Sequence, residues 1–354
     1  MHANPFQQFA PLSAIALLAA TPAAAQQSLE SAFRTTGSEI VAAFEPQRAV
    51  LQSSSAVIRQ GRTQLAYGVV VSTDGHILTK ASEVDGIGDL NVIIDRREYR
   101  DVEVRIVDPV WDVALLRVDA SDLVPVEFID TDADDLPHGT WVVANGATSR
   151  LARRAIGGVI SANARPIPAA GGAVLGIVME VTDEGLLIKS VVEGSGAERA
   201  GLAEGDMLLS VAGADVAIPE DVVEAMGERS AGETIDVRYR RDDEEVEVVV
   251  PLIAREELFA EQMMTRNDMM SGVFSKRRSG FPRIIQHDIL GNNSSVGGPL
   301  LDLDGRCVGM YIARANRSES FAIPAVEVRE IADRLITAAD AAVTPTRELQ
   351  QSAQ

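Results

Sequence analysis

The residues with the clearest capacity for chemistry lie in one segment near the C-terminal end of the sequence, from Gln286 to Leu300. Two adjacent serines, Ser294 and Ser295, stand just before a Gly-Gly pair, and His287 lies a few residues upstream. A serine hydroxyl served by a histidine base is the arrangement that attacks carbonyl groups. The segment therefore raises the question of acyl-transfer chemistry, such as peptide-bond hydrolysis.

The run Asn292–Leu300 and its flanks resemble the nucleophile loop of the HtrA/Do-like family of trypsin-like serine proteases. That family reads Gln-x-Asp, a short loop, Gly-Asn-Ser-Gly-Gly-Pro-Leu, a strand and an Asp-Gly turn, and this chain follows the same order without a gap. On this resemblance Val296 occupies the nucleophile position, and a valine side chain cannot attack a carbonyl. Ser294 replaces the family's glycine, which changes the loop that forms the oxyanion hole.

The two other triad positions fall in an earlier pair of strands. The segment from Gly68 to Val84 resembles the family's hairpin that leads to Thr-Asn-x-His-Val, and the histidine position falls on Ser82. A second segment resembles Asp-x-Ala-Leu-Leu and places Asp112 on the orienting acid. A serine hydroxyl has no pKa near neutrality and cannot replace imidazole as a base. The resemblance implies that only Asp112 survives, with the Ser82 hydroxyl as its one candidate partner.

One non-standard pair stays open as a fallback, Ser295 with His287, because the two residues lie in the same segment. Nothing in the family pattern predicts that the His287 side chain faces the loop with Ser295. The favoured interpretation is therefore that His287 is an ordinary structural histidine. The acidic stretch 130–135 lacks the glycine and the terminal glutamate of a calcium loop, so it is interpreted as a linker. We expect neither a metal ion nor a cofactor.

Residues 172–253 resemble a PDZ domain inserted into the protease-like pattern. The order of strand, short helix, Ala-Gly-Leu, Gly-Asp and a strand ending in a glycine turn runs from Gly185 to Gly213. In such a domain a glycine-containing loop directs backbone N–H groups at a peptide's terminal carboxylate, and the next strand pairs with the peptide. An apolar groove wall favours a ligand with an apolar C-terminal residue. The residues that we expect to form the groove are Leu175, Gly176, Ile177, Val178, Val222 and Met226.

Composition narrows the range of partners. The 354-residue chain is 46% hydrophobic and has a formal net charge of −20, so nucleic acid and anionic membrane surfaces would repel it. Residues 1–25 contain no charged side chain and end in Ala-Ala-Ala, which predicts a signal peptide and an exported, periplasmic protein. No later run reaches the ~20 apolar residues of a membrane span. The single cysteine, Cys307, is expected to be a buried hydrophobic residue.

Short strands joined by tight turns predict a mostly β protein. The resemblance implies a chymotrypsin-like double β-barrel with an inserted α+β PDZ domain. The expected parts are a signal peptide (1–25), a lead-in (26–48), a first barrel (49–128), a second barrel in two pieces (138–168 and 280–336), the PDZ domain (172–253), a Met-rich connector (254–279) and a disordered tail (337–354).

Three functions remain compatible with these patterns. The favoured hypothesis is a non-catalytic member of the protease family that binds peptides or protein C-termini through its PDZ domain. The second is an atypical serine endopeptidase with a non-standard nucleophile. The third is a regulatory subunit that binds an active protease relative. The double replacement at Ser82 and Val296 favours the first, because nucleophile and base are both required for proteolysis.

Overall fold

The structure is a computed structural model, and it describes residues 30–33, 37–146, 153–168, 172–227, 229–258, 274–291, 293–316 and 318–351. The predicted signal peptide and the four methionines of the connector, at positions 263, 264, 269 and 270, lie outside the described residues. The chain enters the fold through short helices: η1 (Ser31–Phe33), α1 (Ser38–Ala43) and α2 (Glu45–Ser54).

Helix α2 continues beyond the predicted lead-in, so the first strand begins at Ser55 and not near residue 49. Proline in the first turn, here Pro46, suits a helix because its missing N–H would have no partner there. Gln47 and Leu51, one turn apart, are both buried, and Leu51 belongs to the main hydrophobic core. Packing against the barrels therefore extends the helix through residues 49–54, which we assigned to the first barrel.

The first barrel is a seven-stranded antiparallel sheet in the order β5-β4-β1-β2-β3-β7-β6. The predicted hairpin is confirmed, because Val69 of β2 pairs with Leu78 of β3. Its strands are β1 (Ser55–Gln60), β2 (Thr63–Val70), β3 (His76–Lys80), β4 (Leu90–Ile94), β5 (Arg97–Tyr99), β6 (Glu103–Asp108) and β7 (Val113–Arg117), with η2 (Ala81–Glu83) directly after β3.

The second barrel is closed, in the order β18-β21-β20-β19-β8-β9, and two of its strands precede the PDZ module while four follow it. A short turn, η3 (Ala133–Asp135), lies in the acidic linker, where Arg283 binds Asp132 and Asp134. The strands are β8 (Trp141–Asn145), β9 (Ala155–Ile167), β18 (Phe281–His287), β19 (Pro299–Leu301), β20 (Cys307–Arg314) and β21 (Ser320–Pro324), with η4 (Asn293–Ser295) before β19.

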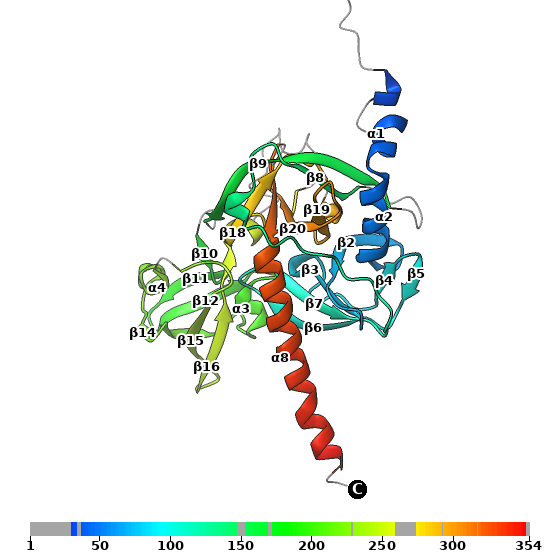
Figure 1. The fold of residues 1–354 in the computed structure, drawn as a ribbon. Helices are drawn as coiled ribbons and strands as arrows, with labels where there is room; N and C mark the ends of the chain where they lie inside the picture. Colours follow the sequence, from blue (N-terminus) through cyan, green and yellow to red (C-terminus); the bar gives the residue numbers. More distant parts are fainter. Residues whose placement is uncertain are drawn as a thin grey trace, which may run out of the picture.

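The PDZ module lies beside the barrels, with its own sheet and its own core (Figure 1). The sheet runs β11-β12-β13-β15-β16, with β14 paired to β13, and the short pair β10–β17 joins the module's two ends. Its elements are β10 (Ala173–Val174), β11 (Ile177–Thr182), β12 (Gly185–Val191), α3 (Gly196–Arg199), β13 (Met207–Val211), β14 (Ala214–Asp215), α4 (Pro219–Met226), β15 (Thr234–Arg241), β16 (Glu244–Pro251), β17 (Ile253–Ala254) and α5 (Arg255–Leu258).

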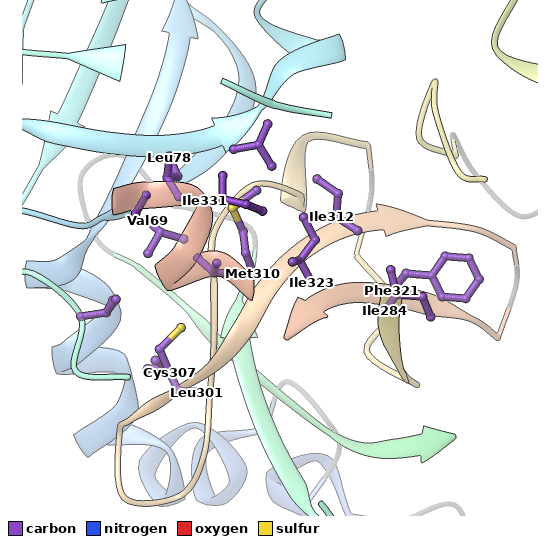
Figure 2. Packing of buried hydrophobic residues seen from close by; sticks show 14 of the residues in the cluster. Val69, Leu78, Ile284, Leu301, Cys307, Met310, Ile312, Phe321, Ile323 and Ile331 are labelled. Atoms are coloured by element: carbon purple, nitrogen blue, oxygen red, sulfur yellow. The ribbon is translucent and has the colours of Figure 1, made fainter. Parts of the chain in front are cut away.

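One large hydrophobic cluster joins both barrels to the C-terminal helix α8 (Ala325–Gln351). Figure 2 shows Val69 and Leu78 of the first barrel next to Ile331 of α8, with Met310 of the second barrel close by. The two barrels thus share this cluster, and each also has a further cluster of its own. The predicted fold class, a mostly β double barrel with a PDZ domain, is confirmed.

Helix α8 also runs through most of the predicted disordered tail, residues 337–354, since it ends only at Gln351. The stretch after Thr337 contains four alanines within five residues, and alanine is the strongest helix former. Ala339 is still buried in the main core. Local helix propensity and this contact together explain why the helix continues past Leu335.

Cys307 lies on β20 with no exposed surface, and burial raises the pKa of its thiol to about 12. The thiolate is the reactive form, so we expect the folded protein at pH 8 to resist labelling by a chromogenic disulfide reagent. The same protein in denaturant should release one equivalent of the reporter thiol per chain. Rapid stoichiometric labelling of the folded protein would contradict this assignment.

Candidate functional site

Asp112, which the resemblance implied as the orienting acid, is buried, and its carboxylate oxygens accept hydrogen bonds from two neighbouring residues. Asp112 Oδ1 accepts a hydrogen bond from Ser82 N at 2.7 Å, and Oδ2 accepts one from Ser82 Oγ at 3.0 Å. Oδ2 also accepts a hydrogen bond from Lys80 Nζ, which forms an ion pair with the carboxylate. Ser82 therefore stands beside Asp112 as the resemblance implied, and a lysine that we had not singled out completes the site.

Lys80 has no exposed surface. Its Nζ donates a second hydrogen bond, of 3.0 Å, to the backbone carbonyl of Arg277, and it lies 5.7 Å from the centre of the Phe281 ring. The sequence contained a signal for this role, because Lys80 stands where the family motif Thr-Asn-x-His-Val has its asparagine. A charge removed from water needs an opposite charge and well-placed acceptors, and Asp112 and the Arg277 carbonyl supply them.

Arg277 fixes the loop that carries Asp112. Its guanidinium donates hydrogen bonds to the carbonyl oxygens of Pro109 and Val110, the latter at 2.8 Å, and it lies 4.9 Å from the Phe281 ring centre. The side chain is buried, so these hydrogen bonds take the place of those with water. The chain segment after the PDZ module thus helps to hold the first-barrel acid in place.

Little space remains at this site. A pocket of about 50 Å³ is lined by Ser82, Asp112 and Arg277 on the barrel side and by Gly232 and Leu252 of the PDZ module on the other. Such a volume holds a few water molecules, whereas ligand pockets measure roughly 300–1,000 Å³. The PDZ module therefore covers the Ser82–Asp112 site.

Val296, for which the resemblance implied the nucleophile position, is fully buried in a hydrophobic cluster that includes Leu300 and Tyr311. Its carbonyl accepts a hydrogen bond from Tyr67 N at 2.8 Å. The next residue, Gly297, has a φ of +89°, and a side chain there would meet Thr79 Oγ1 and Lys80 N. The loop is thus packed tightly against the end of β3, close to Ser82. The Val296 side chain lies in the hydrophobic cluster and not in an open site.

The structure does not form the fallback pair. His287 has no exposed surface, neither of its ring nitrogens has a hydrogen-bond partner, and its ring packs edge-on against Tyr311 at 4.7 Å between centres. Ser295 is buried beside Gly291. A base must lie within hydrogen-bond reach of the proton that it abstracts, and His287 makes no such contact with Ser295.

Burial lowers the pKa of His287 to about 3, so the folded protein keeps this ring neutral. The unfolded chain binds a proton near pH 6.5. Between these values the unfolded state binds more protons, so stability falls as the pH drops below about 6.5, by about 1.4 kcal/mol per unit. We expect the wild type to lose about 2 kcal/mol more than His287→Phe between pH 7 and pH 5, measured by urea unfolding. Equal pH dependence in the two proteins would contradict this.

The PDZ groove lies between β11 and α4 and has a volume of about 650 Å³. Strand β11 is the edge strand of its sheet and pairs only with β12 among the described strands. Gly176 has a φ of +83°, which suits glycine in the loop before β11. All six predicted groove residues line this space: Leu175, Gly176, Ile177, Val178, Val222 and Met226.

These residues differ in accessibility. Leu175 and Val222 are 3% and 2% exposed and belong to the PDZ core, so they shape the groove from beneath. Ile177 and Met226 are half-buried, and Val178 is 47% exposed. The groove also contains residues that we did not predict, among them Val223 and Arg229, whose guanidinium donates to the carbonyls of Ala225 and Met226 at the end of α4.

The described residues contain no group of three His, Cys, Asp or Glu side chains that could hold a metal ion. Within the same residues, no helix has the length and apolar character that crossing a membrane requires.

Comparison with known proteins agrees with this architecture. Residues 66–195 match the model of the trypsin-like peptidase domain, and residues 173–252 match that of the PDZ domain. Residues 173–195 fall in both matches, but in the structure they form β10 to β12 of the PDZ module.

Three similar proteins share the name probable periplasmic serine endoprotease DegP-like. The one from Marinomonas sp. (strain MWYL1) is 27% identical over 274 residues, covering 55% of this chain and 58% of that protein. Those from Halomonas elongata and Pseudomonas fulva are 34% identical over 109 and 111 residues, covering 30% and 31% of this chain and 22% and 23% of those proteins. The chain thus spans 58% or less of the length of these relatives.

The fold and the matched domains define a trypsin-like peptidase fold that carries a PDZ domain. Together with the similarity to the DegP-like proteins, these matches support the resemblance to the HtrA/Do-like family.

Proposed function

We propose that this chain is a non-catalytic HtrA/Do-like protein that binds peptide or protein C-termini in its PDZ groove. The main support for a loss of catalysis comes from Asp112. Its carboxylate accepts hydrogen bonds from Lys80 and Ser82, whereas the corresponding acid of a protease would orient a histidine. With Val296 buried at the nucleophile position, the site has neither an attacking group nor a base. Lys80 instead donates to the Arg277 carbonyl before β18, and the Val296 carbonyl accepts from Tyr67 N of the first barrel.

The groove supports the binding half of the proposal. Strand β11 offers an edge for an added peptide strand, and half-buried Ile177 and Met226 offer apolar contacts for side chains of the ligand. A volume of about 650 Å³ matches the usual range for a bound ligand. We infer a ligand with a free carboxylate and an apolar last residue, because the loop containing Gly176 precedes the edge strand as in carboxylate-binding loops.

We further propose that the protein is exported and acts in the periplasm. The relatives are named periplasmic, and the uncharged, alanine-rich N-terminal 25 residues favour a cleaved signal peptide.

A cleavage assay separates this proposal from the endopeptidase alternative. Purified protein is incubated with an unfolded substrate, and the products are analysed by mass spectrometry for the wild type, Ser295→Ala, Ser294→Ala and Val296→Ala. We expect no cleavage above buffer in any of the four. Cleavage by the wild type that disappears in Ser295→Ala but persists in Ser294→Ala and Val296→Ala would establish a non-standard nucleophile and overturn the proposal.

A further inference from the structure

The PDZ groove is largely apolar, but it also carries positive charge. Among the described residues that line it, the only ionisable side chains are those of Arg229 and Arg255, and none is acidic. The chain as a whole has 52 acidic and 32 basic residues, so the charge of this groove is opposite to that of the chain. A surface with cations and no acid favours anionic ligands.

The two arginines lie at the same end of the groove, because the segments that carry them are hydrogen-bonded to each other. Arg229 stands just after α4, in a loop whose Gly232 N donates to the Leu252 carbonyl at 2.8 Å. Leu252 N donates back to the Glu233 carbonyl, also at 2.8 Å. Leu252 is followed by β17 and then by Arg255, so the two segments run side by side.

This end of the groove also holds the loop at Gly176, the proposed binding site for the ligand's terminal carboxylate. Strand β17 pairs with β10, which leads directly into that loop. Arg255 N donates to the Gly172 carbonyl at 3.1 Å, and a side chain at Gly176 would meet Leu258 of α5. The matched PDZ domain ends at residue 252, so α5 adds Arg255 to the groove from outside that domain.

The two arginines are held differently. Arg229 is half-buried, and its Nη1 donates to the carbonyls of Ala225 and Met226 at 2.7 and 2.8 Å. A cation at the C-terminus of a helix is favoured by the helix dipole, so this charge is fixed beside the groove. Arg255 is exposed, and an exposed arginine side chain can move to form bidentate hydrogen bonds with a carboxylate.

We propose that the groove selects chain ends that carry an acidic side chain beside the terminal carboxylate, with Arg255 as the specificity-determining residue and Arg229 as a fixed supporting cation. A terminal carboxylate brings one negative charge to an end of the groove that has two arginines. Each residue of an extended ligand adds about 3.3 Å, so only an acid in the last few residues lies close to them. The inference rests on the proposed binding of C-termini and adds the sequence that is preferred.

The test compares three peptides that all end in valine with a free carboxylate. The first has glutamate at the penultimate position, the second has glutamine there, and the third has the composition of the first with its glutamate moved to the sixth position from the end. We expect the first to bind about three- to tenfold tighter than the others, by fluorescence anisotropy at low salt. The net charge of −20 would weaken the binding of any acidic peptide, so this preference requires local cations.

Two variants assign the preference to one residue. Arg255→Gln should bind the first peptide no more tightly than the second. Arg238→Gln removes an arginine that is 44% exposed on β15 of the same module, outside the groove, and it should keep the preference of the wild type. High salt should reduce the preference in the wild type, because exposed charges are screened.

Equal affinity of the wild type for the first and second peptides would overturn this inference and leave the proposed binding of C-termini intact. The same holds if Arg255→Gln keeps the full preference, or if the third peptide binds as tightly as the first. If none of the three peptides binds, both the inference and the proposed function are wrong.

Discussion

Replacing Lys80 by methionine is expected to reduce the free energy of unfolding by about 3–5 kcal/mol, because the substitution leaves the Asp112 carboxylate buried without its cation. Methionine keeps much of the volume and the apolar stem, so lost packing contributes little. Ser82 would still donate to both carboxylate oxygens, but neutral donors do not compensate a buried charge as an ammonium group does. Urea unfolding at pH 7 measures the difference.

Two further variants make the interpretation specific. Lys189→Met removes a lysine that is 60% exposed and pairs with Glu180 at the surface, so it should change stability by less than about 1 kcal/mol. The double variant Lys80→Met, Asp112→Asn removes both buried charges and should recover much of the loss. A small effect of Lys80→Met, or a double variant as unstable as the single one, would contradict the assignment of Lys80 as the counter-ion of Asp112.

Replacing Met226 by glutamate is expected to weaken peptide binding by at least tenfold. Met226 is half-buried and lines the groove, so a carboxylate there would be desolvated against an apolar ligand side chain. A penalty of only about 1.4 kcal/mol corresponds to a tenfold loss of affinity. Fluorescence anisotropy with a labelled peptide that ends in valine measures the change.

Val249→Glu is the matched control, because Val249 is an exposed apolar residue of the same module on β16, at the opposite edge of the sheet from β11. Its affinity should equal that of the wild type. Gly176 is unsuitable for this test, since any side chain there would overlap Ser195 and would require a φ of +83°. Equal affinities of Met226→Glu and Val249→Glu for the peptide would show that the peptide does not bind in the groove.

Motif spacing was sufficient to predict the parts of the fold that depend on neighbouring residues. The Val69–Leu78 hairpin is a local pattern of a turn and apolar residues, and it lies as expected. The order of PDZ elements along the chain, which the resemblance implied, is also found in the structure. The position of Ser82 beside Asp112, 30 residues further along the chain, was implied by the family resemblance and is found in the structure.

The features that sequence patterns did not reveal depend on residues far apart in the chain. Lys80 looks like an ordinary end of a strand until Asp112 and the Arg277 carbonyl, 197 residues further on, meet it in the core. The extent of α2 depends on burial of Leu51 against both barrels. The position of the PDZ module over Ser82 likewise depends on the packing of two domains against each other. The order of motifs along the chain does not predict this packing.

The most direct test of the central claim, that this fold binds chain ends and does not cut them, compares two forms of one peptide. A peptide with an apolar last residue is titrated into the purified protein as the free acid and as its C-terminal amide, by isothermal titration calorimetry. We predict saturable binding of the acid, at least tenfold tighter than that of the amide, because only the acid presents a carboxylate to the loop at Gly176. Equal affinity of the two forms, or no binding of either, would contradict the account.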